Sequence, residues 1–465
     1  MNRSVFLLPV FLLFFMWGAS AQSVVTPARN SPIQSGPMVG YSEMREVMLW
    51  VQTKQPARVQ IRYHETGKPE PAFLTAEVLT EREQANTAHL IADQVEPGKK
   101  YEYALLLAGQ KVSLPYPTTF QTQALWQYRA DPPAFRFAVG SCTYVNEPEV
   151  DRPGQAYGGG YEIFTAINAQ KPDFMLWTGD NTYLREVDWN SRTGVFRRYT
   201  HTRSLPEMQP LLASTHHYAT WDDHDYGPND SDRSFWLKPV TLEAFDLFWA
   251  NPNRVFAEGC TGTFFWSDCQ FFLMDDRTFR APNDTPDGPD KPYLGERQVQ
   301  WLIDALKGSR ASFKFIVVGN QVLNPAKVFE NYSNYGSERD KLLKAIADEK
   351  IPGVVFLSGD RHHTVLHKID RVANGRATDG GAGSGGTGTY PLYDITISPL
   401  TAGPAKALPM ELSQLSQVEG TYLSEKNFGM LDVSGPLKDR VLTIKVYDQK
   451  GVEKWTRAIR AMDLK

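Results

Sequence analysis

The segment that decides the fold is residues 173–183, DFMLWTGDNTY, in which a short apolar run ends in a glycine and polar side chains follow at once. Four other segments have a similar form: FRFAVG at 135–140, HHYATW at 216–221, FKFIVVG at 313–319 and GVVFLSG at 353–359. Their apolar residues are mostly consecutive rather than alternating, as is typical of strands buried on both faces. These segments therefore predict strands at the centre of a covered sheet.

Helical patterns lie between the predicted strands. Residues 296–306 carry apolar side chains at helical spacing on one face, and Gly308 follows as a stop signal. Residues 337–347 carry a second apolar stripe, with Ser337 as the expected N-cap. Strands that alternate with helices predict a layered α/β architecture.

Closer to the N-terminus, apolar and polar residues alternate in short runs separated by turns. The runs are EVMLWVQT at 46–53, ARVQIRYHE at 57–65, TAHLIAD at 87–93, KYEYALLLAG at 100–109 and TTFQTQ at 118–123. This period of two predicts an antiparallel β-sandwich of the immunoglobulin or fibronectin type III shape. Such a unit could be a binding or lid module, but a packing appendage is the simpler interpretation.

The domain organisation follows from these two patterns. The chain has 465 residues, more than the roughly 100 to 200 residues of an ordinary single domain. The sequence Asp-Pro-Pro at 131–133 marks a boundary. We expect a sandwich domain at 22–127 and an α/β domain at 133–465.

Residues 1–21 have the features of a secretory signal peptide. Arg3 precedes an apolar run at 5–17, and the small residues Ala-Ser-Ala at 19–21 follow as a cleavage pattern. The alternative is an uncleaved anchor helix, but the run is shorter than the ~20 apolar residues that span a membrane. Because the segment has no arginine pair and no lipid-accepting cysteine, we expect Sec-type export to the periplasm or the extracellular space, with no later membrane-spanning segment.

Composition excludes several classes of protein. Hydrophobic residues make up 42% and charged residues 22% of the chain, which indicates neither a disordered nor a membrane-embedded protein. The net charge is -4 and no basic stripe occurs, which argues against nucleic-acid binding. An anionic ligand would therefore depend on metal ions or a few arginines for attraction. The sequence does not indicate an oligomeric state.

The three cysteines cannot all pair with one another. Cys260 and Cys269 flank a predicted hairpin that turns near Ser267 and Asp268. This register places the two thiols beyond the ~7 Å Cα separation of a disulfide. A bridge between them is disfavoured, and Cys142 is the odd thiol.

Each predicted core strand ends in a polar cluster. The clusters are Ser141-Cys142, Asp180-Asn181-Thr182-Tyr183, Asp222-Asp223-His224-Asp225, Asn320-Gln321 and Asp360-Arg361-His362-His363. Ligands of open α/β sheets collect at the carboxyl ends of strands, so we expect these side chains to meet. Taken singly, each has an ordinary explanation, such as an inert thiol for Cys142, a core aromatic for Tyr183 or a turn residue for Asn320. Together they predict a metal site.

The order of these motifs, Ser-Cys, Gly-Asp-x-x-Tyr, Trp-Asp-Asp-His-Asp, Gly-Asn-Gln and Gly-Asp-x-His, resembles the alkaline phosphatase D family (PhoD-like), which is related in its core to purple acid phosphatases. The resemblance covers nearly the whole chain after residue 21, since that family also carries an N-terminal β-sandwich. It implies a metallophosphatase-like catalytic domain of α/β/β/α layers, iron and calcium in the active site, and hydrolysis of phosphate monoesters and diesters. The twin-arginine export signal common in the family is absent here.

The resemblance also implies a division of the ligands. Four residues would bind iron: Cys142, Asp180, Tyr183 and His362. Three more would hold a second metal that Asp180 bridges: Asp223, Asn320 and Asp360. Thiolate, phenolate and carboxylate are anionic donors suited to Fe³⁺, whereas an all-oxygen set suits Ca²⁺ better than zinc.

A mechanism follows from that pairing. A hydroxide between two cations ~3.5 to 4 Å apart can attack phosphorus in line, while the metals neutralise charge on the phosphoryl oxygens. His224, beside Asp223, is placed to protonate the leaving alkoxide or to bind a phosphoryl oxygen. Arg361 or Arg277 could clamp a phosphate oxygen, although each could equally be a salt-bridge partner.

Several motifs and functions keep two interpretations. His216, His217 and His363 could be outer-shell groups, but structural histidines are the simpler expectation. The glycine-rich run at 379–390 could cradle phosphate, but it lacks the Lys-Ser/Thr of a P-loop and favours a surface loop. The chain could also be a phosphodiesterase or phospholipase of the same fold. A non-catalytic exported binding protein is disfavoured because the expected ligand set is complete.

Overall fold

The computed structural model describes residues 31–370, 372–373, 376–377, 390–414 and 416–465. The expected signal peptide and the glycines of the expected surface loop lie outside these residues. In the part of the chain that is described, no helix has the length and apolar character needed to cross a membrane.

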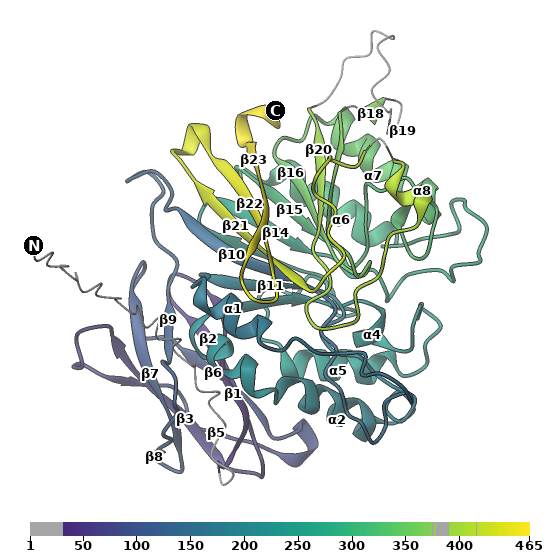
Figure 1. Cartoon of the computed structure of the whole chain (residues 1–465). Helices are drawn as coiled ribbons and strands as arrows, with labels where there is room; N and C mark the ends of the chain where they lie inside the picture. Colours follow the sequence, from purple (N-terminus) through teal and green to yellow (C-terminus); the bar gives the residue numbers. More distant parts are fainter. Residues whose placement is uncertain (1–30, 371, 374–375, 378–389, 415) are drawn as a thin grey trace, which may run out of the picture.

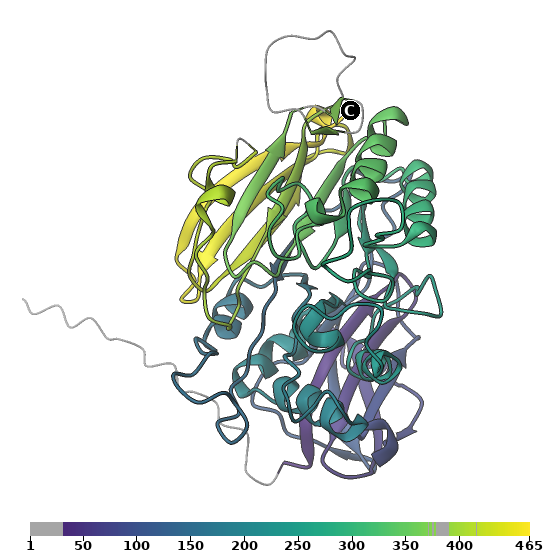
Figure 2. The ribbon, with the colours of Figure 1, turned by 90° about the vertical axis from the view of Figure 1, so that its right-hand side faces the viewer.

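The expected core strands are present and fall into two large sheets (Figures 1 and 2). Three of them, β10 (Phe135–Gly140), β11 (Phe174–Thr178) and β12 (His216–Thr220), are parallel neighbours in a nine-stranded sheet. The other two, β15 (Lys314–Val317) and β16 (Val354–Ser358), are parallel neighbours in a six-stranded sheet. All five carboxyl ends therefore belong to the same layered domain.

The remaining strands of this part extend both sheets. The nine-stranded sheet continues through β21 (Asn427–Ser434), β22 (Val441–Asp448) and β23 (Glu453–Arg460). The six-stranded sheet also contains β13 (Gly262–Trp266), β14 (Cys269–Leu273), β17 (Val365–Ile369) and β20 (Leu392–Thr396). A short pair is formed by β18 (Val372–Ala373) and β19 (Arg376–Ala377).

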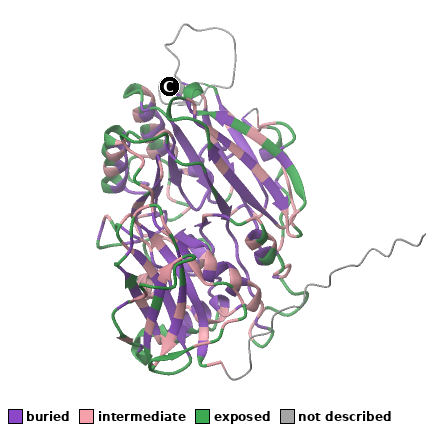
Figure 3. Cartoon of the chain, turned by 90° about the vertical axis from the view of Figure 1, so that its left-hand side faces the viewer, coloured by how far each residue is buried: buried purple, intermediate pink, exposed green. Residues whose placement is uncertain are grey.

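The two sheets pack face to face through aromatic side chains. Phe137 of β10 and Phe174 of β11 stack with their ring centres 4.8 Å apart. Phe271 of β14 meets them edge-on at 5.3 and 5.4 Å. The alternate residues Ala138 and Met175 belong to a second apolar core under the helices. Both faces of these strands are thus buried, which explains their unbroken apolar pattern (Figure 3).

Helices cover the outer faces of both sheets and complete the expected α/β/β/α layers (Figure 1). On the nine-stranded sheet they are α1 (Ile163–Ala169), α2 (Arg192–Arg203), α3 (Gln209–Ser214) and α5 (Lys238–Phe248). On the six-stranded sheet they are α6 (Glu296–Gly308) and α7 (Gly336–Asp348). Short helices are α4 (Asp223–Tyr226), α8 (Pro409–Leu412), η1 (Arg82–Gln84), η2 (Pro206–Met208), η3 (Tyr332–Tyr335), η4 (Leu437–Asp439) and η5 (Ala461–Asp463).

One detail of the sequence-based expectation is wrong, and two are confirmed. The N-cap of α7 is Tyr335 rather than Ser337, because η3 runs directly into α7 and places Ser337 in its first turn. The hairpin of β13 and β14 turns where expected, with Trp266 opposite Cys269. All three cysteines are buried free thiols.

The expected N-terminal sandwich is present, but one of its sheets is shared. Its strands are β1 (Ile33–Ser42), β2 (Val47–Thr53), β3 (Arg58–Glu65), β4 (Phe73–Leu74), β5 (Val78–Leu79), β6 (Thr87–Ala92), β7 (Lys100–Leu107), β8 (Gln110–Lys111) and β9 (Thr119–Gln121). Strand β1 pairs in parallel with β12 through Val39 and His216, so β1, β2 and β6 continue the nine-stranded sheet. The domain boundary at 131–133 stays a prediction, because strands from both parts share this sheet.

His216 joins the sandwich to the α/β domain. Its Nδ1 donates to the carbonyl oxygen of Gly40 at 2.7 Å, and its Nε2 accepts from the backbone N–H of Gln121 at 3.1 Å. Burial lowers the pKa of His216 to about 4. His217 is also buried, accepting from Trp177 Nε1 at 3.0 Å. Both histidines have structural contacts, as expected.

We predict that acid weakens this junction. The unfolded His216 titrates near 6.5, so its contribution is full above that pH and is lost as pH falls toward 4, by up to about 3 kcal/mol. The midpoint of urea unfolding should therefore fall between pH 6.5 and 4, and less steeply in His216→Gln. His64→Gln, whose ring contacts the neighbouring Glu65 carbonyl, is the matched control. Parallel pH profiles for the wild type and His216→Gln would refute this role.

Candidate metal centre

The polar clusters meet where the carboxyl ends of the two sheets converge. Backbone hydrogen bonds join neighbouring strand ends within each sheet, since Cys142 N donates to Gly179 O at 3.3 Å and Gly359 N donates to Gly319 O at 2.8 Å. The sheets approach so closely at Gly359 that an added Cβ would lie 2.5 Å from Ser141 Oγ. Side chains from distant parts of the chain therefore reach one shared site.

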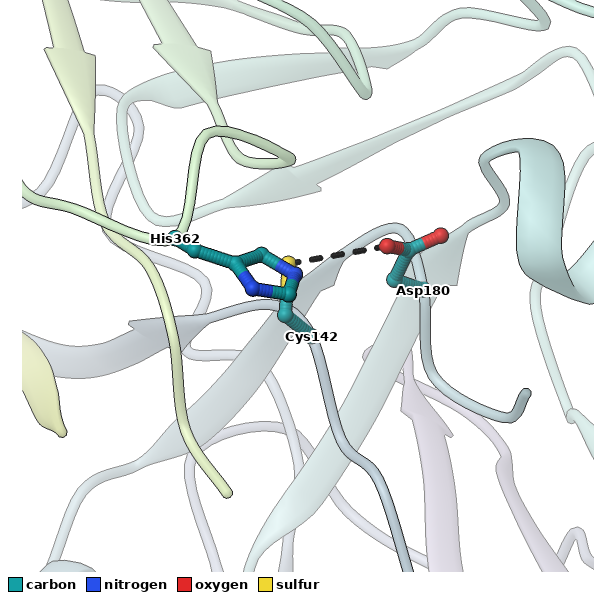
Figure 4. A group of neighbouring side chains, drawn as sticks. All are labelled: Cys142, Asp180 and His362. Atoms are coloured by element: carbon teal, nitrogen blue, oxygen red, sulfur yellow. Dashed lines mark hydrogen bonds between the residues drawn. The ribbon is translucent and has the colours of Figure 1, made fainter. Parts of the chain in front are cut away.

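The first group of donors contains Cys142, Asp180, Tyr183 and His362. Figure 4 shows Cys142, Asp180 and His362 directed toward one another from three separate segments. Cys142 Sγ lies 3.6 Å from Asp180 Oδ2, and Tyr183 Oη donates to the same oxygen at 2.8 Å. Tyr183 Oη is also 3.0 Å from His362 Nε2. These four residues, expected to act together, lie together.

The second group is made of oxygen donors. Carboxylate oxygens of Asp222, Asp223 and Asp360 lie within 4.8 Å of one another. Asn320 donates from Nδ2 to Asp222 Oδ2 at 3.1 Å, and its Oδ1 is buried without a hydrogen-bond partner among the described residues. Asp180 links the two groups, because its carboxylate is also within 4.8 Å of ligand atoms of Asp223 and His224.

The backbone at the site is held in an unusual conformation. Cys142, Asp180, Asp360 and His362 have φ values of 60°, 52°, 62° and 52°, in the left-handed region that side-chain-bearing residues seldom adopt. Each such residue costs of order 1 to 3 kcal/mol, and these conformations concentrate at functional sites. In four of the seven expected metal ligands, a strained backbone at or just after a strand end therefore sets the direction of the side chain.

Burial of like charge dominates the electrostatics of the site. Burial raises the pKa of Asp180 well above its usual range, and the charges of Asp223 and Cys142 raise it further. Burial, with Glu330 and Asp223 beside it, raises the pKa of Asp360 to about 7. Burial likewise raises the pKa of the Cys142 thiol to about 11. A cation bound among these groups would favour their charged forms.

The surrounding residues orient the donors. His362 Nδ1 donates to Gly403 O at 2.7 Å, which leaves Nε2 on the side of Tyr183 and Asp180. Ser398 Oγ donates to Cys142 Sγ at 3.1 Å. Such contacts fix the tautomer of a ligating histidine and the direction of a thiolate. This arrangement fits a metal centre.

The expected catalytic groups lie around these donors. The ring of His224 packs against Tyr183 with centres 4.1 Å apart, and its Nδ1 is buried without a partner in the described part of the chain. Arg361 donates to Glu411 at 2.9 Å and lies over the ring of Phe329, 4.1 Å from its centre.

Arg277 is fully buried and its hydrogen-bonding capacity is used by the protein. Its Nε donates to Asp222 Oδ1 at 2.7 Å, and its two terminal nitrogens donate to the Glu330 carboxylate at 2.9 and 2.8 Å. Further bonds reach Ser231 O and, from Nη2, Asp222 Oδ1. All five N–H groups thus have acceptors.

Some residues of the site were not identified as site residues from the sequence. Asp222 was visible in its motif but was not assigned to a metal, and its carboxylate lies in the oxygen group beside Asp223 and Asp360. Tyr157, with Oη 3.1 Å from His362 Nδ1, and Ser398 lie outside the five motifs. No periodicity or spacing marks these two positions, because tertiary folding alone brings them to the site.

Sheets packed between helix layers, with metal-type donors at the strand ends, define a metallophosphatase-like protein. A model described as PhoD-like phosphatase matches residues 137–406, which is more than half of the chain. A domain of unknown function (DUF7800) matches residues 30–125. The chain belongs to the PhoD-like phosphatase family.

Known proteins and solved structures similar to this chain include the following. Alkaline phosphatase D of Bacillus subtilis (strain 168) is 23% identical over 330 residues, covering 60% of this chain and 53% of that protein. The match thus spans about half the length of this curated relative. A solved structure of PhoD superposes with a TM-score of 0.73 at 17% identity, covering 93% of both chains, which shows a common fold.

We predict that Gly319→Ala disrupts the oxygen group. An added Cβ would lie 2.5 Å from Asp222 Cγ and 2.7 Å from Asp276 Oδ2, two buried side chains with little room to move. The affinity for the second metal should fall about 10- to 100-fold, as expected when a group that orients metal ligands is displaced. The content of that metal after dialysis, measured by elemental analysis, should fall with it. Gly288→Ala, which meets nothing within 4 Å, should keep the wild-type content. Full metal occupancy in a folded Gly319→Ala variant would contradict this account of the site.

Proposed function

We propose that the protein is an exported, metal-dependent hydrolase of phosphate esters. The observation that carries this proposal is the convergence of Cys142, Asp180, Tyr183 and His362, from three separate segments, beside a second group of oxygen donors. Membership of the PhoD-like phosphatase family supports it. Export rests on the signal pattern at residues 1–21.

The donor sets favour two different metals. Cys142, Asp180, Tyr183 and His362 would hold a ferric ion, since thiolate and phenolate are strongly anionic donors. The second set, Asp223, Asn320 and Asp360 with Asp180 as the bridge, would hold Ca²⁺ through oxygen atoms. When bound, such ions activate water and offset charge on the phosphoryl oxygens.

His224 would contact the substrate as a neutral ring. Burial lowers its pKa, so the imidazole is largely uncharged near neutral pH. A neutral imidazole still carries one N–H, which can donate to a phosphoryl oxygen. Hydrogen bonding to the substrate therefore suits His224 better than proton donation to the leaving group at alkaline pH.

The two arginines have different roles in this proposal. Arg361 has a buried Nε without a partner among the described residues, so a donor remains for a phosphate oxygen. Arg277 has no N–H group left for a substrate, because Asp222, Glu330 and Ser231 accept hydrogen bonds from all five of them. We therefore assign Arg277 to holding Asp222 in place.

Phosphate monoesters are the primary proposed substrates, with diesters as a second class. A phosphodiesterase or phospholipase would use the same donors and differ in what the surroundings admit. A non-catalytic binding protein is the weaker alternative, because it would have no need to retain strained backbone at Cys142, Asp180, Asp360 and His362.

The proposal is tested with Cys142→Ala and a matched control. Protein isolated from its exported compartment should contain iron and calcium and show a visible charge-transfer band from phenolate and thiolate on iron. Cys142→Ala should lose the band or shift it, and lose at least about a hundredfold in kcat/KM for p-nitrophenyl phosphate, because removal of a ligand costs at least as much as removal of an outer-shell partner. Cys260→Ala removes another buried free thiol and should leave both unchanged.

Asp180→Ala should abolish turnover altogether, because it removes the carboxylate shared by both groups. Turnover is measured with p-nitrophenyl phosphate and bis(p-nitrophenyl) phosphate. A colourless wild type, or a fully active Cys142→Ala variant, would disprove the iron assignment. Metal-loaded wild type without activity on either ester would disprove the function.

A further inference from the structure

We propose that Arg185 is a substrate-binding residue that takes an anionic oxygen of the phosphoryl group and favours monoesters over diesters. This inference rests on the proposed function and specifies its substrate class. Arg185 follows the Gly-Asp-x-x-Tyr motif by two residues and belongs to none of the five motifs.

The guanidinium of Arg185 is buried with little compensation. The residue is 7% exposed, and its Nε has no hydrogen-bond partner in the described part of the chain. Its ion pair with Glu186 is long, 3.5 Å, and the Glu186 side chain is 49% exposed. Arg152 already holds that carboxylate with bonds of 3.1 and 2.8 Å. Burying a cation with so weak a partner destabilises the folded protein unless a bound ligand supplies a negative charge.

A tight turn fixes the position of Arg185. Its backbone N–H donates to Asp188 Oδ2 at 2.9 Å, and its carbonyl accepts from Asp188 N at 2.8 Å. Asp188 is anchored in turn by the buried Arg198, whose Nε donates to Asp188 Oδ2 at 2.7 Å. The next residue toward the metal ligands, Leu184, donates to His224 O at 3.1 Å. The turn is therefore rigid and attached to the element that carries His224.

The guanidinium lies near Tyr144, whose ring packs against the proposed ligand Tyr183. Its central carbon is 5.8 Å from the centre of the Tyr144 ring, and the Tyr144 ring is 5.1 Å from that of Tyr183. His224 packs on the same tyrosine, 4.1 Å away between ring centres. Arg185 is thus placed on the Tyr183 and His224 side of the centre.

The chemistry of the two ester classes gives the preference. A phosphomonoester has three non-bridging oxygens and carries a charge of about -2 at neutral pH, because its second pKa is near 6. A diester has two such oxygens and a single charge. An additional protein cation next to two metals therefore stabilises the monoester more. Planar guanidinium groups suit this task, since they donate two parallel bonds to a phosphate.

The test compares Arg185→Gln with Arg185→Lys and Arg152→Gln in the metal-loaded protein. Arg152 is 71% exposed and pairs with the same Glu186, so it controls for loss of charge at this surface. Inorganic phosphate is the probe, with its dissociation constant measured by calorimetry. Arg185→Gln should raise the dissociation constant for phosphate about 10- to 100-fold, as expected for loss of a charge-assisted hydrogen bond. Arg185→Lys should be intermediate, and Arg152→Gln should stay within about twofold of the wild type.

Kinetics with the two p-nitrophenyl esters test the specificity. Arg185→Gln should raise KM for the monoester about tenfold or more and change KM for the diester by less than about threefold. The metal content should stay unchanged. Equal phosphate affinity in folded Arg185→Gln, equal losses on both esters, or loss of metal would each overturn the inference. Failure of the proposed function is distinct, since it would appear as an inactive metal-loaded wild type.

Discussion

Concentrated negative charge at the junction of two sheets is the constraint on which the rest of the structure depends. The aspartates buried there include Asp180, Asp222, Asp223 and Asp276. Buried carboxylates without counter-charges destabilise a fold by several kcal/mol each. Arg277 compensates on one side by bridging Asp222 and Glu330. On the other side, beside Cys142 and Tyr183, metal ions are the counter-charge that we propose.

The strand ends that carry these charged side chains approach one another closely. Gly179, Gly319 and Gly359 stand where any Cβ would lie within 2.6 Å of an atom from another strand end. The proposed ligands Cys142, Asp180, Asp360 and His362 lie close to these points and have left-handed backbone. Packing of the aromatic core between the sheets supplies the stability that holds these strained positions. The buried aromatic core thus helps to hold the donor side chains of the site in fixed positions.

The N-terminal sandwich is part of the same framework. Strand β1 lies beside β12, whose carboxyl end leads to Asp222 and Asp223. His216, at the start of β12, bonds both to Gly40 and to Gln121 of the sandwich. This region therefore supports the strand that carries part of the oxygen group. A packing role for the sandwich agrees with these contacts.

Sequence alone determined what depends on local order. Unbroken apolar runs defined the five core strands, alternation defined the sandwich strands, and the residues after each run supplied the expected ligands, because strand period and chain adjacency are local properties. Only the tertiary structure decided the rest. It placed Ser398 beside Cys142 and Tyr157 beside His362. It also provided acceptors for all five N–H groups of Arg277, whereas the Arg185 guanidinium has only a weak ion pair among the described residues. Those relations join residues far apart in the chain, so they depend on how sheets pack and not on any spacing in the sequence.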